Sequence, residues 1–202
     1  MDHLHLIVGL GNPGAEYART RHNAGFLVVE HLAARWGGSW STERKFNARL
    51  SKGERSGKRV ILCEPQTFMN ASGEAVGAVA DFYQIPPDRL LVVVDDADLP
   101  LGHLRLRPGG GPGGHHGLES IQARIGTQNY ARQRVGIGRQ SAAREITGHV
   151  LGRFGSTETA LLAKILGLAS DQAETWLTDG IQKAMNRFNG VADDAGKERE
   201  SQ

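Results

Sequence analysis

The segment from Leu6 to Gly25 most constrains the fold of this chain. It begins with the apolar run Leu6–Val8, which predicts a short buried strand. A glycine-rich turn, Gly9–Gly14, follows this strand, and an apolar helix is expected from about Ala24. Polar side chains crowd the stretch between the turn and the helix: Asn12, Tyr17, Arg19, Arg21, His22 and Asn23. A rigid strand that ends in a polar loop is typical of a functional site.

The same glycines, Gly9, Gly11 and Gly14, match the spacing of the dinucleotide-binding fingerprint. In that fingerprint the third glycine opens a helix, whereas here the helix is expected to begin well downstream. The acidic residue that should end a second strand would be Glu30, which lies inside the helical run. A nucleotide-binding oxidoreductase is therefore the last of the functions we consider.

Composition is typical of one globular domain, expected over residues 1–190, with a disordered tail over 191–202. The chain has 202 residues, of which 39% are hydrophobic and 23% are charged. No apolar run approaches the ~20 residues of a membrane span, and we see no secretory signal. The single cysteine, Cys63, excludes an internal disulfide, which fits a cytoplasmic protein. Its strand-like surroundings predict a buried, unreactive thiol.

Positive charge is concentrated in one part of the chain. Residues 101–153 contain eight arginines, no lysine and two acidic residues, a net charge of +6, although the whole chain carries only +2. The remainder therefore sums to −4. Arginine grips phosphate oxygens in pairs, so this part of the chain favours a nucleic-acid partner, with a solvated, salt-bridged surface as the alternative.

Strand and helix patterns alternate along the chain, which predicts an α/β sheet with helices on both faces. The uninterrupted apolar run Leu90–Val94 predicts a central strand, and the alternating His103–Arg107 predicts a strand with one wet face. Further expected strands are Phe46–Leu50 and Arg59–Cys63, joined as a hairpin around Gly53–Gly57, and Arg134–Gly138.

Helices are expected at about Ala24–Trp36, from a cap at Ser72 to before Pro86, and around Leu118–Ile125 up to Gly126. The region from Ser156 to Phe188 also has helical spacing, with a break expected near Ser170.

The chain lacks the common motifs of covalent and metal-dependent hydrolases, including G-x-S-x-G, H-E-x-x-H and CxxC. His115 and His116 have no acidic or cysteine partner at metal-ligand spacing, so we expect no metal. Water is then the expected nucleophile, and it needs a general base.

His22 is the candidate base, because a neutral imidazole can accept a proton near physiological pH. Asp95, at the carboxyl end of the Leu90–Val94 strand, would orient it, since ligands collect at the carboxyl ends of parallel strands. The neighbouring Asp96 and Asp98 are interpreted as turn residues.

Asn12 and Asn70 are candidate donors to an oxyanion. By position alone, a turn or cap role is the better interpretation for both.

Several separated motifs together resemble the bacterial-type peptidyl-tRNA hydrolase family. They are GLGNPGAEYARTRHNAG at 9–25, FMNASG at 68–73, VDDADLP at 94–100, the glycine run to His115, and RVGIG at 134–138. They occur in order and cover roughly Leu4–Phe188. The resemblance implies one compact domain with a mixed, mostly parallel twisted sheet, and a monomer that needs no cofactor. It also implies hydrolysis of the ester that joins a peptide to the terminal ribose of tRNA.

The resemblance assigns roles to individual residues of this chain. Asn12, His22, Asn70 and Asp95 match the family's active centre. Substrate contacts are implied for Tyr17, Phe68, Met69, Asn70, His115 and His116, and a clamp on the 5′-terminal phosphate of tRNA for Arg105 and Arg134. His116 departs from the family, where an asparagine occupies this position, and its imidazole cannot offer the paired donor and acceptor of an amide. A non-catalytic RNA-binding homologue is the alternative function.

Overall fold

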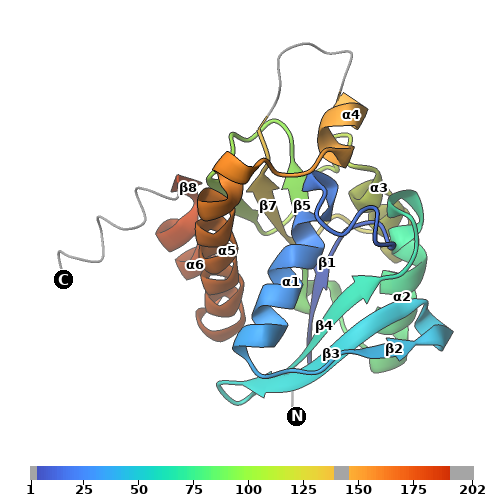
Figure 1. The fold of residues 1–202 in the computed structure, drawn as a ribbon. Coiled ribbons are helices and arrows are strands. Elements are labelled where there is room, and N and C mark those ends of the chain that lie inside the picture. The colour runs from blue at the N-terminus through green and yellow to red at the C-terminus, as the bar shows by residue number, and fades with distance from the viewer. Residues whose placement is uncertain (1–3, 139–145, 192–202) are drawn as a thin grey trace.

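The chain alternates strands and helices as its pattern predicts, and a computed structural model describes residues 4–138 and 146–191 (Figure 1). The described residues form one α/β domain around an eight-stranded sheet with the order β2-β3-β4-β1-β5-β7-β6-β8. The inner strands β4, β1, β5 and β7 run parallel, and the remaining pairs are antiparallel. The strands are β1 (His5–Gly9), β2 (Ser41–Glu43), β3 (Ala48–Arg55), β4 (Lys58–Pro65), β5 (Leu90–Asp96), β6 (His103–Arg107), β7 (Ala131–Gly136) and β8 (Gly190–Val191). The predicted α/β fold class is confirmed: the sheet is mixed, and its core is parallel.

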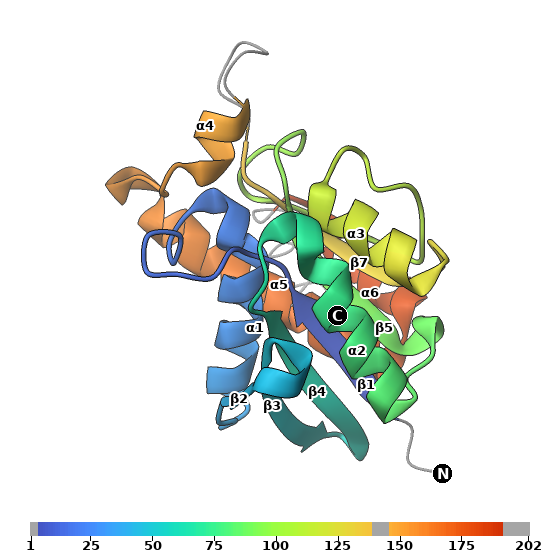
Figure 2. The same cartoon turned by 90° about the vertical axis from the view of Figure 1, so that its right-hand side faces the viewer.

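Helices cover both faces of the sheet (Figures 1 and 2). One face carries α1 (Ala24–Arg35), α5 (Thr159–Asp179) and α6 (Ile181–Phe188), and the other carries α2 (Ser72–Tyr83) and α3 (His116–Ile125). A short helix, α4 (Ile146–Leu151), stands beyond the carboxyl end of β5 (Figure 1). In the part of the chain that the structure describes, no helix is both long and apolar enough to cross a membrane.

Strand β5 is buried on both faces, as its apolar run predicts. Leu91 and Val93 pack into the core on the α1 and α5 side, whereas Leu90, Val92 and Val94 pack into the core on the α2 side. Alternation along a strand then directs the next residue, Asp95, to the α1 side at the end of the sheet.

The glycines of the first turn allow close packing and do not form a dinucleotide site. A Cβ on Gly9 would overlap the carbonyl oxygen of Gly25, and a Cβ on Gly25 would overlap the carbonyl oxygen of Val93. These glycines therefore let the start of α1 lie directly against β1 and β5. Helix α1 begins at Ala24, far beyond the third glycine of the fingerprint.

The hairpin of β3 and β4 is confirmed, but its strands are longer than predicted. They are joined at Ser56 and Gly57, which both have positive φ (50° and 74°), the conformation of a tight two-residue hairpin turn. The first part of the predicted turn, residues 53–55, belongs instead to β3, because paired backbone does not require apolar side chains. Phe46, where the strand was expected to begin, lies in a single-turn helix before β3. Strand β2 was not predicted, and β7 spans Ala131–Gly136 where Arg134–Gly138 was expected.

Two helix predictions were wrong in detail. Ser72 is the first residue of α2 and does not cap it; its hydroxyl donates to the carbonyl of Met69 (2.8 Å). The long C-terminal helix continues through Ser170, which is buried and bonded to His31, and breaks at Gly180 (φ 92°). Helix α4 was not predicted.

The expected tail begins inside the sheet, because Val191 belongs to β8, and residues 192–202 lie outside the described part of the chain. Cys63 is buried as expected, and burial raises the pKa of its thiol.

Candidate active site

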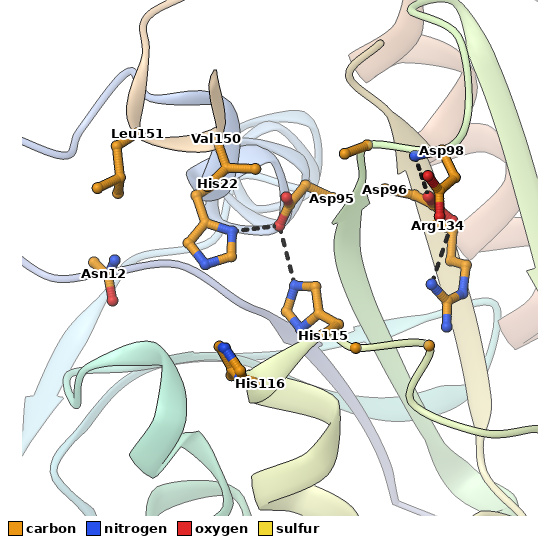
Figure 3. A pocket seen from close by; sticks show the side chains of 13 residues that line it. Asn12, His22, Asp95, Asp96, Asp98, His115, His116, Arg134, Val150 and Leu151 are labelled. Carbon is orange, nitrogen blue, oxygen red and sulfur yellow. Dashed lines mark hydrogen bonds and ion pairs between the residues drawn. The ribbon is translucent and has the colours of Figure 1, made fainter. Parts of the chain in front are cut away.

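The carboxyl ends of β1 and β5 meet at one edge of the sheet and bring His22 and Asp95 together. β1 and β5 are parallel neighbours, and the loop after β1 leads into a single-turn helix, Arg21–Asn23, that carries His22. His22 Nδ1 lies 2.8 Å from Asp95 Oδ1, although the two residues are 73 positions apart in the chain (Figure 3). The predicted meeting of these two side chains is confirmed.

A second imidazole contacts the same carboxylate oxygen. His115 Nε2 lies 3.1 Å from Asp95 Oδ1, while His115 Nδ1 accepts from the amide of Leu118 (3.4 Å) at the start of α3. Because Nδ1 is an acceptor, the hydrogen-bond network assigns the His115 proton to Nε2. The contact from His22 likewise assigns its proton to Nδ1, which leaves His22 Nε2 able to accept a proton.

Asp95 is a buried carboxylate that stays charged. Its residue exposure is only 3%. Burial alone would raise the pKa of Asp95, but hydrogen bonds from His115 and His22, with their charges, outweigh burial and lower it to about 2. A fixed negative charge therefore stands behind His22 at neutral pH.

Asn12 is held beside this cluster by Asn23. The side chain of Asn23 accepts from the Asn12 amide (2.9 Å) and donates to the Asn12 carbonyl (2.9 Å). The Oδ1 atom of Asn12 accepts from the amide of Met69 (2.8 Å), which leaves its NH2 group on the pocket side. Asn23 was not predicted to belong to the site; its position next to His22 was the available signal.

Asn12, His22, Asp95 and His115 line a pocket of about 470 Å³. Its wall also includes Val150 and Leu151 of α4, and Figure 3 shows Val150 beside His22. These apolar residues were not predicted to belong to the site. His116 lines the pocket too, with a side chain that is 74% exposed and pairs with Glu119 (3.0 Å).

Of the other predicted contacts, Arg134 lines this pocket, whereas Tyr17, Phe68, Met69 and Asn70 do not. Met69 is buried, and Asn70 next to it is exposed on a single-turn helix. Phe68 is 63% exposed, and Tyr17 is half-buried in the turn after Gly14.

Four arginines form a block on β6 and β7, which we call the arginine block. Arg105 faces Arg134 and Arg107 faces Arg132 in the antiparallel register. The two guanidinium groups on β7 bond the glycine loop: those of Arg132 and Arg134 both donate to Gly111 O (3.0 and 3.3 Å).

Arg134 makes two further contacts that occupy its side chain. It donates to Pro112 O (3.2 Å) and pairs with Asp96 (3.3 Å). Asp96 in turn accepts from the amide of Asp98 (2.8 Å), which confirms its interpretation as a turn residue. Arg105 and Arg107 are exposed.

The three residues His22, Asp95 and His115 also place potential metal-ligand atoms within 4.8 Å of one another. This grouping was not expected from sequence spacing, because Asp95 lies far from both histidines in the chain. One nitrogen of each imidazole lies within hydrogen-bond distance of Asp95 Oδ1. Hydrogen bonding therefore accounts for the contacts within the cluster.

Comparison with known proteins places this geometry in a family. The family profile described as Peptidyl-tRNA hydrolase matches residues 6–198. The chain is 47% identical over 199 residues to peptidyl-tRNA hydrolase from Synechococcus sp. (strain JA-3-3Ab), covering 98% of this chain and 88% of the relative. It is 49% identical over 185 residues to the enzyme of Chloroflexus aurantiacus (strain ATCC 29366 / DSM 635 / J-10-fl), covering 91% and 98%.

Solved structures agree with the sequence comparisons. The crystal structure of peptidyl-tRNA hydrolase from Acinetobacter baumannii superposes with a TM-score of 0.88 at 41% identity, covering 95% of this chain and 97% of that one. A peptidyl-tRNA hydrolase crystallised with N-propanol gives the same values. The chain belongs to the peptidyl-tRNA hydrolase family.

Proposed function

We propose that this protein hydrolyses the ester bond of peptidyl-tRNA and releases free tRNA and peptide. The observation that carries the proposal is the His22–Asp95 pair, 2.8 Å apart, in a pocket that Asn12 also lines. An ester needs only an activated water, and this pair is suited to activate one.

His22 is the general base in this proposal. Its Nε2 takes a proton from water while the water oxygen bonds to the ester carbonyl carbon. Asp95 stabilises the imidazolium that forms and holds the ring in the required tautomer. The imidazolium then returns the proton to the ribose oxygen as the ester bond breaks. The products are a free ribose hydroxyl and a peptide carboxylic acid, which releases its proton to solvent and becomes a carboxylate.

Asn12 is the better placed of the two candidate oxyanion donors. Its NH2 group is on the pocket side because its oxygen is occupied by the Met69 amide. Asn70 is exposed next to Met69, and we assign it, with Tyr17, Phe68 and Met69, to contacts with the substrate around the pocket.

The arginine block is the observation that favours RNA as part of the substrate. Like charges at facing positions destabilise a sheet, so four arginines in such positions favour an anionic ligand. Exposed Arg105 is the more available phosphate contact, whereas Arg134 also shapes the glycine loop. His115 and His116, at the end of that loop, would approach the terminal nucleotide. We expect a monomer in the cytoplasm, as the family resemblance implies.

The direct test follows both products from a purified N-blocked aminoacyl-tRNA. We expect deacylated tRNA and blocked amino acid to appear together, in equal amounts, with no added cofactor. Tight tRNA binding without release would instead identify a non-catalytic RNA-binding homologue. Tight binding of NADH would revive the oxidoreductase alternative.

A further inference from the structure

We propose that Arg21 and Glu158 form a latch that holds His22 and the α4 wall of the pocket in one arrangement. Both are positioning residues, and the inference rests on the proposed function, because it concerns the rate of that reaction. Nothing in the mechanism above uses either residue.

The latch is a bidentate ion pair between Arg21 and Glu158, next to the proposed base His22. Arg21 directly precedes His22, and its side chain is 9% exposed. Its guanidinium contacts both carboxylate oxygens of Glu158, with Nη1–Oε1 at 3.1 Å and Nη2–Oε2 at 2.8 Å. This fork geometry fixes orientation as well as distance. Hydrogen bonds from Arg21 lower the pKa of Glu158, so the pair is charged at neutral pH.

The same arginine is tied to the segment that follows α4. Its backbone amide donates to Gly152 O (2.9 Å), and its guanidinium lies 5.0 Å from the ring centre of Phe154. The preceding residue, Thr20, pairs with Arg153 through an isolated antiparallel β-bridge. Residues 152–154, directly after α4, therefore contact the loop that carries the base.

A third anchor joins α4 to the end of β7. His149 Nε2 contacts the carbonyls of Ile137 (3.3 Å) and Gly138 (2.7 Å), and Arg21 also donates to Ile137 O (3.4 Å). The next two residues after His149 are Val150 and Leu151, which line the pocket. Movement of this segment would displace the wall beside His22 as well as His22 itself.

A second ion pair provides a matched control. Arg35 and Asp171 (2.6 Å) join α1 to α5 within those helices, whereas Arg21 and Glu158 join the single-turn helices that precede α1 and α5. Both pairs connect the same two parts of the fold. Only the Arg21–Glu158 pair lies beside the pocket.

The test compares Glu158→Gln, Arg21→Lys and Asp171→Asn with wild type in single-turnover hydrolysis of N-blocked aminoacyl-tRNA, well below the melting temperature. Because small displacements of a base are costly, we expect Glu158→Gln to lower the rate constant by about 10-fold. The dissociation constant for deacylated tRNA should stay within about twofold, since the arginine block is untouched. Arg21→Lys should lower the rate constant by less than Glu158→Gln does, because lysine keeps the positive charge but cannot make the two parallel hydrogen bonds of a guanidinium group. Asp171→Asn should keep the wild-type rate.

A second measurement does not depend on turnover. In nitrogen-15 spectra of the imidazoles, the hydrogen-bonded Nδ1–H signal of His22, assigned with His22→Ala, should shift or broaden in Glu158→Gln and remain in Asp171→Asn. The latch is overturned if Glu158→Gln retains the wild-type rate and His22 signal, or if Asp171→Asn loses as much rate. An inactive wild type would overturn the proposed function instead, and the imidazole spectra would still decide the latch.

Discussion

The His22–Asp95–His115 cluster lies at the end of β5, and the arginine block begins on its neighbour β7, yet the two are built in opposite ways. In the cluster, one buried carboxylate accepts from two imidazoles, so hydrogen bonds within the protein stabilise its negative charge. In the block, four cations face one another in pairs, and two of them are exposed. The difference indicates that the His22–Asp95–His115 cluster is organised before substrate arrives. In the proposed function, the exposed arginines of the block gain their partner only when the RNA binds.

His22→Ala should cause the largest change and affect only the cluster. Removal of a general base is expected to lower the hydrolysis rate by about 10²–10⁴-fold. Single-turnover release of peptide measures the rate, and filter binding of deacylated tRNA measures the affinity, which should not change. If His22→Ala lowered the affinity for deacylated tRNA as much as it lowered the rate, the cluster and the arginine block could not be separated into catalysis and binding.

Asp95→Asn should have the next largest effect. The amide carries no charge to stabilise an imidazolium, so we expect a rate loss of about 10²-fold. The same assay measures it. A rate near wild type would show that His22 does not depend on Asp95.

The lowered pKa of Asp95 also predicts how the free energy of unfolding depends on pH. Its folded pKa, about 2, lies below the ordinary value of 3.8. The stabilisation it provides is therefore complete above about pH 4 and is lost as the pH falls toward 2. Denaturant titrations should show the stability advantage of wild type over Asp95→Asn shrinking across that range; an advantage that grew on acidification would contradict this assignment.

Arg105→Ala should change binding and leave the chemistry intact. Loss of one phosphate contact should reduce the slope of log affinity against log salt by about 1. Arg134→Ala should also lower the rate, because it releases the carbonyl of Pro112. Arg59→Ala, on exposed β4 surface, is the control. Equal slopes for Arg105→Ala and wild type would argue against phosphate contact.

The smallest effect on activity is expected at a second buried carboxyl, Glu64. Burial raises the pKa of Glu64 to about 8, helped by Glu30 and opposed by Arg49 (2.7 Å). No imidazole contacts it, and its Oε1 has no hydrogen-bond partner among the described residues. Burial raises the pKa of both carboxyls, and Asp95 and Glu64 thus show that the partners of a buried carboxyl decide whether its pKa ends below or above the ordinary value.

Because the folded pKa of Glu64 is raised, wild type should lose stability as the pH rises from about 4.5 to 8, relative to Glu64→Gln. Thermal melts across this range test the direction, and hydrolysis should remain at the wild-type rate. A stability difference independent of pH would mean that Glu64 does not titrate there.

Sequence patterns predicted the parts of the site that depend on strand order. The buried run of β5 and the strand before Gly9 place Asp95 and the His22 loop at one edge, because parallel neighbours end together. The contact of His115 with Asp95 depends on how α3 packs, which no local pattern specifies. The contribution of α4 to the pocket wall was not predicted, because it too depends on how elements pack against one another.

The arginine block shows a different limit of sequence patterns. Alternation in His103–Arg107 correctly placed Arg105 on a wet face. It did not show that Arg132, whose charge suggests exposure, would be buried against Tyr130 and the glycine loop. Arginines that are near one another in sequence thus differ in the folded sheet: Arg105 and Arg107 are exposed, whereas Arg132 and Arg134 bond the glycine loop.

The most direct test of the account is a double-mutant cycle on His22 and Asp95 in single-turnover hydrolysis. If the two residues act as one unit, the double variant His22→Ala, Asp95→Asn should be no slower than His22→Ala alone, because Asp95 acts only through the imidazole. Rate losses that multiply in the double variant would show that the two side chains work independently, and would contradict the central claim.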